Sequence, residues 1–107
     1  LIIPAAPALA INVVPCGPEF LQVNWHNTTH LGGVSHHVTC FANGGEYDIT
    51  GWRVGDKQWL DRISTGNNRV QWYGDGRWQP EGGINKWSVY TFPNNPGGVH
   101  LDKIRII

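Results

Sequence analysis

The sequence predicts an all-β domain in which two Greek-key motifs form a sandwich. Three observations support this fold class. No 11-residue stretch carries the i, i+3, i+4, i+7 apolar spacing of an amphipathic helix. Short apolar runs alternate instead with turn signals, in a chain that holds 14 Gly and 7 Pro. A five-residue pattern also occurs twice, which indicates a duplicated structural unit.

The duplication is clearest between residues 59–63 and 100–104, where Leu, Asp and Ile recur at the same offsets. Two weaker sequence repeats occur in the same order along the chain and at similar offsets. Together the three repeats indicate a duplicated unit of roughly 40–50 residues. The first key is expected at about residues 11–66 and the second at about 67–107. The repeated residues are expected to be equivalent scaffold positions: Leu60 with Leu101, Asp61 with Asp102, and Ile63 with Ile104.

Two strands are predicted in the first unit. Residues 20–25 form a short run with alternating character that ends at the Asn/Thr-rich residues 27–29. Residues 38–41 end at the Asn-Gly-Gly sequence 43–45, where Asn and Gly tolerate positive φ. Strands this short, separated by frequent turns, are typical of an antiparallel sandwich.

Three strands are predicted in the second unit, at residues 69–73, 87–92 and 103–106. The dipeptide Asp75-Gly76 ends the first of them and favours a type I′ hairpin turn. In that register Gly74 pairs with Arg77 and Tyr73 with Trp78, so two aromatic rings would lie side by side on one face.

Composition restricts the function. A chain of 107 residues is expected to be one domain and a monomer. Eight basic and eight acidic residues cancel, and they are scattered along the chain. The sequence therefore lacks the clustered cationic surface of a nucleic-acid binder or of a polybasic membrane patch.

The amino-terminal residues 1–10 have the character of the end of a signal peptide, with a small-x-small cleavage site at Ala8-Leu9-Ala10. The mature domain would then span residues 11–107. The alternative is an apolar N-terminal arm, and the segment is too short to span a bilayer. An exported, extracellular protein would join its only two cysteines, Cys16 and Cys40, in a disulfide. Two reduced core thiols are the alternative for a cytosolic chain.

Several blocks resemble one family of proteins. These are the residues 11–16, 40–45, 64–70, 86–87 and 104–106, among which Cys-Phe-Ala-Asn at 40–43 and Thr-Gly-Asn-Asn at 65–68 are the most specific. The pattern resembles small secreted βγ-crystallin-like proteins of actinomycetes, which include antifungal chitin-binding and killer-toxin-like proteins. The resemblance implies two Greek keys, one disulfide, export and a non-enzymatic role against fungal walls or cells.

Many domains of that family bind Ca²⁺ through a short run of Asn, Asp, Ser and Thr before a conserved Ile. The corresponding residues 57–62 and 98–103 do not match, because Lys, Trp and Gly side chains supply no oxygen ligands. We expect no Ca²⁺ at these positions and no cofactor. Residues 25–37 and the loop 93–98 depart from the family pattern and are particular to this chain.

The histidines are interpreted as packing residues rather than metal ligands. His36 and His37 are adjacent, so on a strand their side chains point to opposite faces and cannot share an ion there. His26 and His30 would meet only on a helix, which the local sequence disfavours.

A carbohydrate site needs aromatic rings for the apolar faces of sugars and side-chain amides for their hydroxyls. Trp78, Tyr73 and Trp52 are the candidate rings, and Asn94 and Asn95 are candidate amides. Most other Trp residues are expected in the core, as aromatics dominate the packing of small sandwiches. The expected core tryptophans are Trp25, Trp59, Trp72 and Trp87.

No nucleophile motif and no placed carboxylate pair predicts catalysis, so we expect a protein that is not an enzyme. The expected function is binding of a fungal cell-wall polysaccharide such as chitin, followed by growth inhibition. The alternative is a killer-type toxin or inhibitor that binds a protein or membrane target through an exposed loop at residues 28–37 or 93–98. A structural or stress-protective module is the third reading.

Overall fold

The computed structural model describes residues 10–29, 31–49 and 57–107. The predicted leader up to residue 9, the candidate ring Trp52 and His30 lie outside the described residues. The described chain forms strands and turns, and none of it forms a helix long and apolar enough to cross a membrane.

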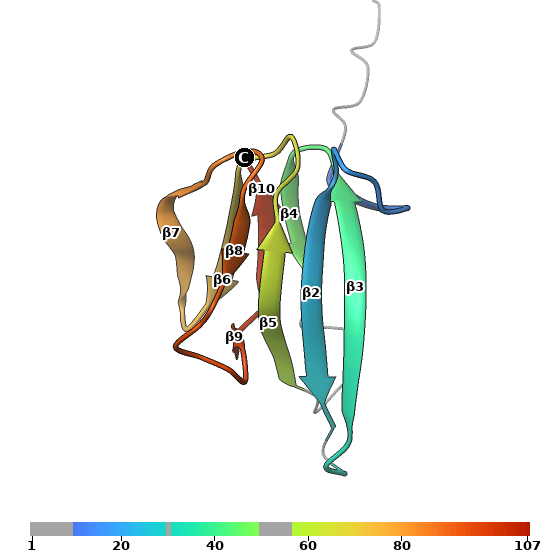
Figure 1. Ribbon diagram of the computed structural model, residues 1–107, viewed down its shortest axis with the longest axis vertical. Coiled ribbons are helices and arrows are strands. Elements are labelled where there is room, and N and C mark those ends of the chain that lie inside the picture. Colours follow the sequence, from blue (N-terminus) through green and yellow to red (C-terminus); the bar gives the residue numbers. More distant parts are fainter. Residues whose placement is uncertain (1–9, 30, 50–56) are drawn as a thin grey trace, which may run out of the picture.

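Ten described strands make two sheets, which face each other as the layers of a sandwich (Figure 1). The first sheet has the order β1-β3-β2-β5-β8, with β9 also paired to β5, and the second has the order β4-β10-β6-β7. Every described pairing is antiparallel. The strand bounds are β1 Asn12–Val14, β2 Leu21–Thr28, β3 Val34–Ala42, β4 Gly45–Asp48, β5 Lys57–Ser64, β6 Val70–Gly74, β7 Arg77–Ile84, β8 Val89–Thr91, β9 Val99–His100 and β10 Lys103–Ile106.

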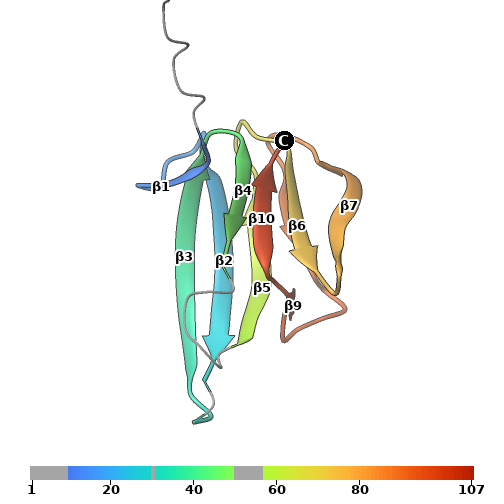
Figure 2. The ribbon, with the colours of Figure 1, turned by 180° about the vertical axis from the view of Figure 1, so that it is seen from behind.

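The strand order shows an exchange between two similar units. In the first unit β3, β2 and β5 lie side by side, while β4 crosses to the second sheet and pairs with β10. In the second unit β7, β6 and β10 lie side by side, while β8 crosses to the first sheet and pairs with β5. Each unit therefore has Greek-key connectivity and gives one strand to the other sheet (Figure 2). This arrangement confirms the all-β, two-key fold class.

The core lies between the sheets and follows from the alternation of side chains along each strand. In β2 the side chains of Leu21, Val23 and Trp25 point inward, and the intervening residues are only partly buried. The repeated Leu and Ile residues are all buried, with Leu60, Ile63 and Ile104 at 0% and Leu101 at 1% exposure. The prediction that these four are core residues is confirmed.

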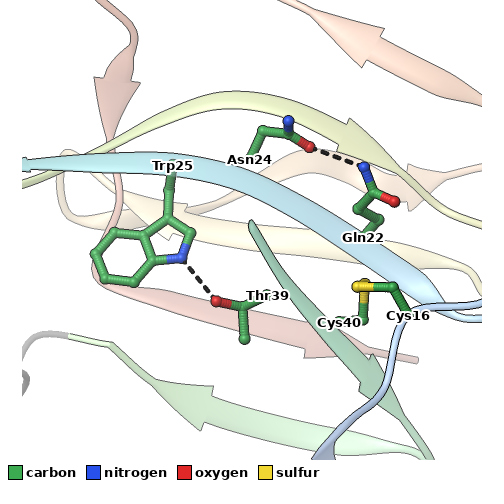
Figure 3. Close-up of a disulfide and its surroundings, with 6 residues drawn as sticks. All are labelled: Cys16, Gln22, Asn24, Trp25, Thr39 and Cys40. Carbon is green, nitrogen blue, oxygen red and sulfur yellow. Dashed lines mark hydrogen bonds between the residues drawn. A yellow bond between two sulfur atoms is a disulfide. The ribbon is translucent and has the colours of Figure 1, made fainter. Parts of the chain in front are cut away.

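The disulfide between Cys16 and Cys40 is present, as predicted, and ties the segment after β1 to β3 (Figure 3). Nearby, the indole N–H of Trp25 donates to Oγ1 of Thr39 at 3.0 Å, so this buried ring has a polar partner. The disulfide joins the segment after β1 to β3, and the Trp25–Thr39 hydrogen bond joins β2 to β3. Both stabilise this edge of the first sheet.

The predictions for Trp87 and for the strand at 38–41 need correction. Trp87 is not a core residue, since its side chain is 67% exposed. It precedes β8 with a positive φ of 57°, and its backbone N–H donates to the carbonyl of Gly66, which leaves the ring in solvent. The strand predicted at 38–41 is also longer, because β3 begins at Val34 and continues the pairing with β2 through His36 and His37.

Candidate functional site

The hairpin between β6 and β7 positions the first two candidate residues. Asp75 and Gly76 both have positive φ, 53° and 79°, as a type I′ turn requires. Tyr73 lies opposite Trp78 in the register, and their ring centroids are 5.2 Å apart in an edge-to-face arrangement. The predicted hairpin and the predicted pair are confirmed.

These two rings lie on the outer face of the second sheet, beside cationic side chains of β10. The guanidinium of Arg105 lies 3.7 Å from the Trp78 ring centroid, and the ammonium of Lys103 lies 5.5 Å from that of Tyr73. Arg105 is itself held by the carboxylate of Glu46 and the amide oxygen of Gln71. One face of Trp78 is therefore covered, and only the remaining surface of its ring can contact a ligand.

A groove of about 470 Å³ lies where β7 separates from β6. The pairing changes register between Val70↔Ile84 and Trp72↔Gln79, so β7 carries extra residues and bows outward. Gly82 and Gly83 lie in this irregular part with φ of 78° and 89°, a conformation that favours glycine. The groove is lined by three aromatic rings, two amides, two charged side chains and a proline: Trp72, Trp78, Tyr90, Gln71, Gln79, Arg77, Glu81 and Pro80.

Trp72, whose ring lines the groove, carries a buried polar atom without a partner. Its side chain is 4% exposed, and Nε1 is the one buried side-chain nitrogen or oxygen in the described part of the chain that lacks a hydrogen bond. Leaving a buried N–H unpaired costs about 1–3 kcal/mol. The ring is held by Phe92 and Tyr90, with centroids 5.3 and 5.6 Å away. The atom is enclosed by the packing around the ring, so the unpaired N–H is a cost to the folded state.

The amides predicted for this site lie elsewhere. Asn94 and Asn95 are exposed on the loop between β8 and β9, and the groove is lined without them. Backbone bonds from Asn95 to Phe92 and from Gly98 to Asn95 form the turns of that loop. Gln71 and Gln79 supply the amides of the groove instead, and Trp72 and Tyr90 add rings that the sequence did not mark as exposed to a ligand. Gly82-Gly83 in β7 is the local sequence feature that could have indicated the irregular pairing of β7 with β6.

A second cluster occupies the outer face of the first sheet. His36, His26, Trp59 and His100 follow one another in register across β3, β2, β5 and β9. We call these four residues the histidine row. Successive ring centroids lie 5.4, 6.4 and 4.5 Å apart. Trp59 is thus a partly buried residue of this row and not a core residue.

Two carboxylates flank the histidine row. Nδ1 of His26 lies 2.7 and 2.9 Å from the two oxygens of Asp61. Asp75, from the β6–β7 turn, pairs with Nδ1 of His100. The side chain of His26 is 12% exposed and that of Asp61 is 30% exposed, so this contact between β2 and β5 is partly buried.

His37 lies apart from this row. Its ring stacks on Trp25 with the centroids 4.4 Å apart, and its Nε2 lies 2.6 Å from Oδ1 of Asn27. The expectation that His36 and His37 face opposite ways is confirmed. Sequence reasoning compared histidines along one strand only, and it missed the pairing of His26 with His36 across two strands.

The comparisons with known proteins agree with the strand topology. Residues 27–105 match the family model described as Beta/Gamma crystallin, which covers most of the chain. Neither the curated proteins nor the solved structures contain a match. The fold of this family is generally a structural or binding scaffold and not that of an enzyme. With two interlocked Greek keys and a match over this length, the chain belongs to the beta/gamma crystallin family.

Proposed function

We propose that this protein is a secreted antifungal-type protein that binds a cell-wall polysaccharide such as chitin and inhibits growth through that binding. The observation that carries the proposal is the groove beside β7, where the rings of Trp72, Trp78 and Tyr90 occur together with the amides of Gln71 and Gln79. Such a mixture of apolar rings with a few directed polar groups is typical of small-ligand sites.

The chemistry of the groove fits an N-acetylated sugar. The pyranose ring offers apolar C–H faces to Trp78 and Tyr90, and the acetamide offers a methyl group and a carbonyl oxygen. Gln71 and Gln79 bring amides to the sugar hydroxyls. The groove volume of about 470 Å³ lies within the ordinary range of roughly 300–1,000 Å³ for ligand pockets.

Export is part of the proposal, and the disulfide supports it. Disulfides persist in oxidising compartments and are rare in the cytosol. Cys16 and Cys40 are paired, and the chain has no other cysteine.

A pull-down with insoluble chitin tests the function. Wild-type protein should sediment with the polymer, and Trp78→Ala should weaken binding by about tenfold or more, as expected for an aromatic anchor. Trp87→Ala is the matched control, because Trp87 is an exposed tryptophan outside the groove. It should sediment like the wild type.

A second variant tests another wall of the groove. Tyr90→Ala removes another ring of the lining, and binding should again weaken by about tenfold or more. Folded wild-type protein that stays in solution over chitin and other insoluble wall polysaccharides would refute the function. Binding that survives both Trp78→Ala and Tyr90→Ala would refute the groove as its site.

A further inference from the structure

We propose that His26, His36 and Asp61 form a binding site for a divalent transition-metal ion of the zinc class. The site lies on the outer face of the first sheet, whereas the proposed polysaccharide groove lies along β7 of the second sheet. The two proposals therefore rest on different residues.

The sheet register brings the two imidazoles together. His26 on β2 pairs directly with His36 on β3, so both side chains leave the same face of the sheet. Their ring centroids are 5.4 Å apart at an interplanar angle of 40°. Two histidines from neighbouring strands can thus reach one ion without any change of the backbone.

An irregularity in β5 adds the carboxylate. Trp25 pairs with Leu60 and Asn24 pairs with Arg62, so Asp61 is an extra residue between two pairs. A bulge of this kind redirects a side chain out of the regular alternation. Here the carboxylate of Asp61 reaches Nδ1 of His26 at 2.7 Å.

The distances suit one small ion. One ligand atom from each of His26, His36 and Asp61 lies within 4.8 Å of the others. Ligands about 2.0–2.1 Å from a tetrahedral zinc ion lie about 3.3 Å from one another. The His26–Asp61 pair has to open by a few tenths of an ångström, and His36 has to approach. His36 is exposed, so its side chain can rotate at little cost.

The ligand types select the metal. Imidazole nitrogen suits zinc, copper and nickel, while Ca²⁺ and Mg²⁺ prefer oxygen ligands throughout. Two imidazoles and one carboxylate leave a fourth tetrahedral position. A depression of about 380 Å³ beside His36 and Asp61, lined also by Asn24 and Val38, has room for a water molecule or an exogenous ligand there.

The contact between His26 and Asp61 prepares the site. In the metal-free protein Nδ1 of His26 lies 2.7 Å from Oδ2 of Asp61, so the two groups are already in contact. An ion bound at Nδ1 requires a neutral imidazole with its proton on Nε2, and the carboxylate then turns one oxygen to the ion. Part of the ordering of both side chains is thereby achieved before binding.

Calorimetric titration of tag-free protein with ZnCl₂ tests the proposal. We expect one zinc ion per chain and a rise of roughly 5 °C or more in the melting temperature at saturating zinc. CaCl₂ at the same concentration should give neither effect. CoCl₂ should give the intense visible absorption of a tetrahedral nitrogen and oxygen site.

Two ligand variants and one control locate the ion. His36→Ala and Asp61→Asn should each weaken zinc binding by about tenfold to a hundredfold. His100→Ala is the matched control, since His100 belongs to the histidine row but not to the ligand set. It should bind zinc like the wild type. Wild-type zinc affinity in both ligand variants, or no binding by the wild-type protein at 1 mM zinc, overturns the proposal.

Discussion

At Gly74, the absence of a side chain lets backbone atoms of a neighbouring segment approach closely. Gly74 ends β6, and a β-carbon built on it would lie 2.0 Å from the carbonyl oxygen of His100. The neighbouring backbone N–H of Asp102 donates to the carbonyl of Tyr73 at 2.8 Å. The hairpin that carries Tyr73 and Trp78 therefore packs closely against residues 100–102, which precede β10.

Gly74→Ala should destabilise the protein by about 2–3 kcal/mol, because the added methyl group has to displace backbone. Gly97→Ala is the matched control, since a β-carbon there meets nothing within 4 Å and Gly97 has no positive φ. It should change stability by less than about 0.5 kcal/mol. Urea unfolding of both variants measures the difference, and equal midpoints would contradict the close approach.

The Thr-Gly-Asn-Asn block is explained at the same scale. The hydroxyl of Thr65 donates toward the carbonyls of Asn85 and Ser88, and its oxygen accepts a hydrogen bond from the N–H of Ser88. Gly66 has a φ of 58°, and a β-carbon there would lie 2.6 Å from two backbone oxygens. The Asn68 amide donates to the carbonyls of Glu19 and Thr65. The block that carried much of the family resemblance is therefore a structural junction between the two keys.

At the level of elements, the disulfide attaches the N-terminal part of the domain to an edge strand. Strand β1 pairs only with β3 in the described chain, through three residues that include Cys40. A pairing this short is weak by itself. The covalent bond between positions 24 residues apart keeps the segment beside β3 when hydrogen bonds break.

Replacement of both Cys16 and Cys40 by Ser should lower the free energy of unfolding by roughly 3–4 kcal/mol, the chain-entropy value for a loop of this size. Guanidinium titration of the oxidised wild type and of the double variant measures it. The groove beside β7 is formed without these residues, so the folded variant should still sediment with chitin. An unchanged unfolding midpoint would show that the loop is already constrained by other contacts.

The elements also show which parts of the structure local sequence could predict. The Asp75-Gly76 hairpin and the register of Tyr73 with Trp78 depend on turn chemistry between near neighbours, and both were predicted. The path of β7 depends on extra residues opposite β6, and the burial of Trp72 depends on Phe92, which follows β8 of the other sheet. Such features require contacts between distant segments, which no local pattern contains.

At the scale of the whole molecule, the exchange of β4 and β8 makes the two keys one cooperative unit. Neither sheet is complete without a strand from the other key. The duplicated Leu and Ile residues meet in one core, which is why the internal repeat predicted the architecture so well. The histidine row lay beyond prediction because it needs the register of four strands at once.

Unfolding in urea should therefore be a single transition. Tryptophan fluorescence reports both keys, since Trp25 lies in the first and Trp72 in the second, and far-ultraviolet circular dichroism reports both sheets. The two signals should give the same midpoint within error. Separate midpoints would show that one key persists after the other has opened.

The strand exchange also decides when a newly made chain can fold. Strand β4 belongs to the first key, yet its partner β10 follows every other described strand along the chain. The second sheet can form around β10 only when almost the entire domain is present. A chain that still lacks β10 leaves the apolar side of the first key uncovered, and uncovered apolar surface of this kind favours aggregation.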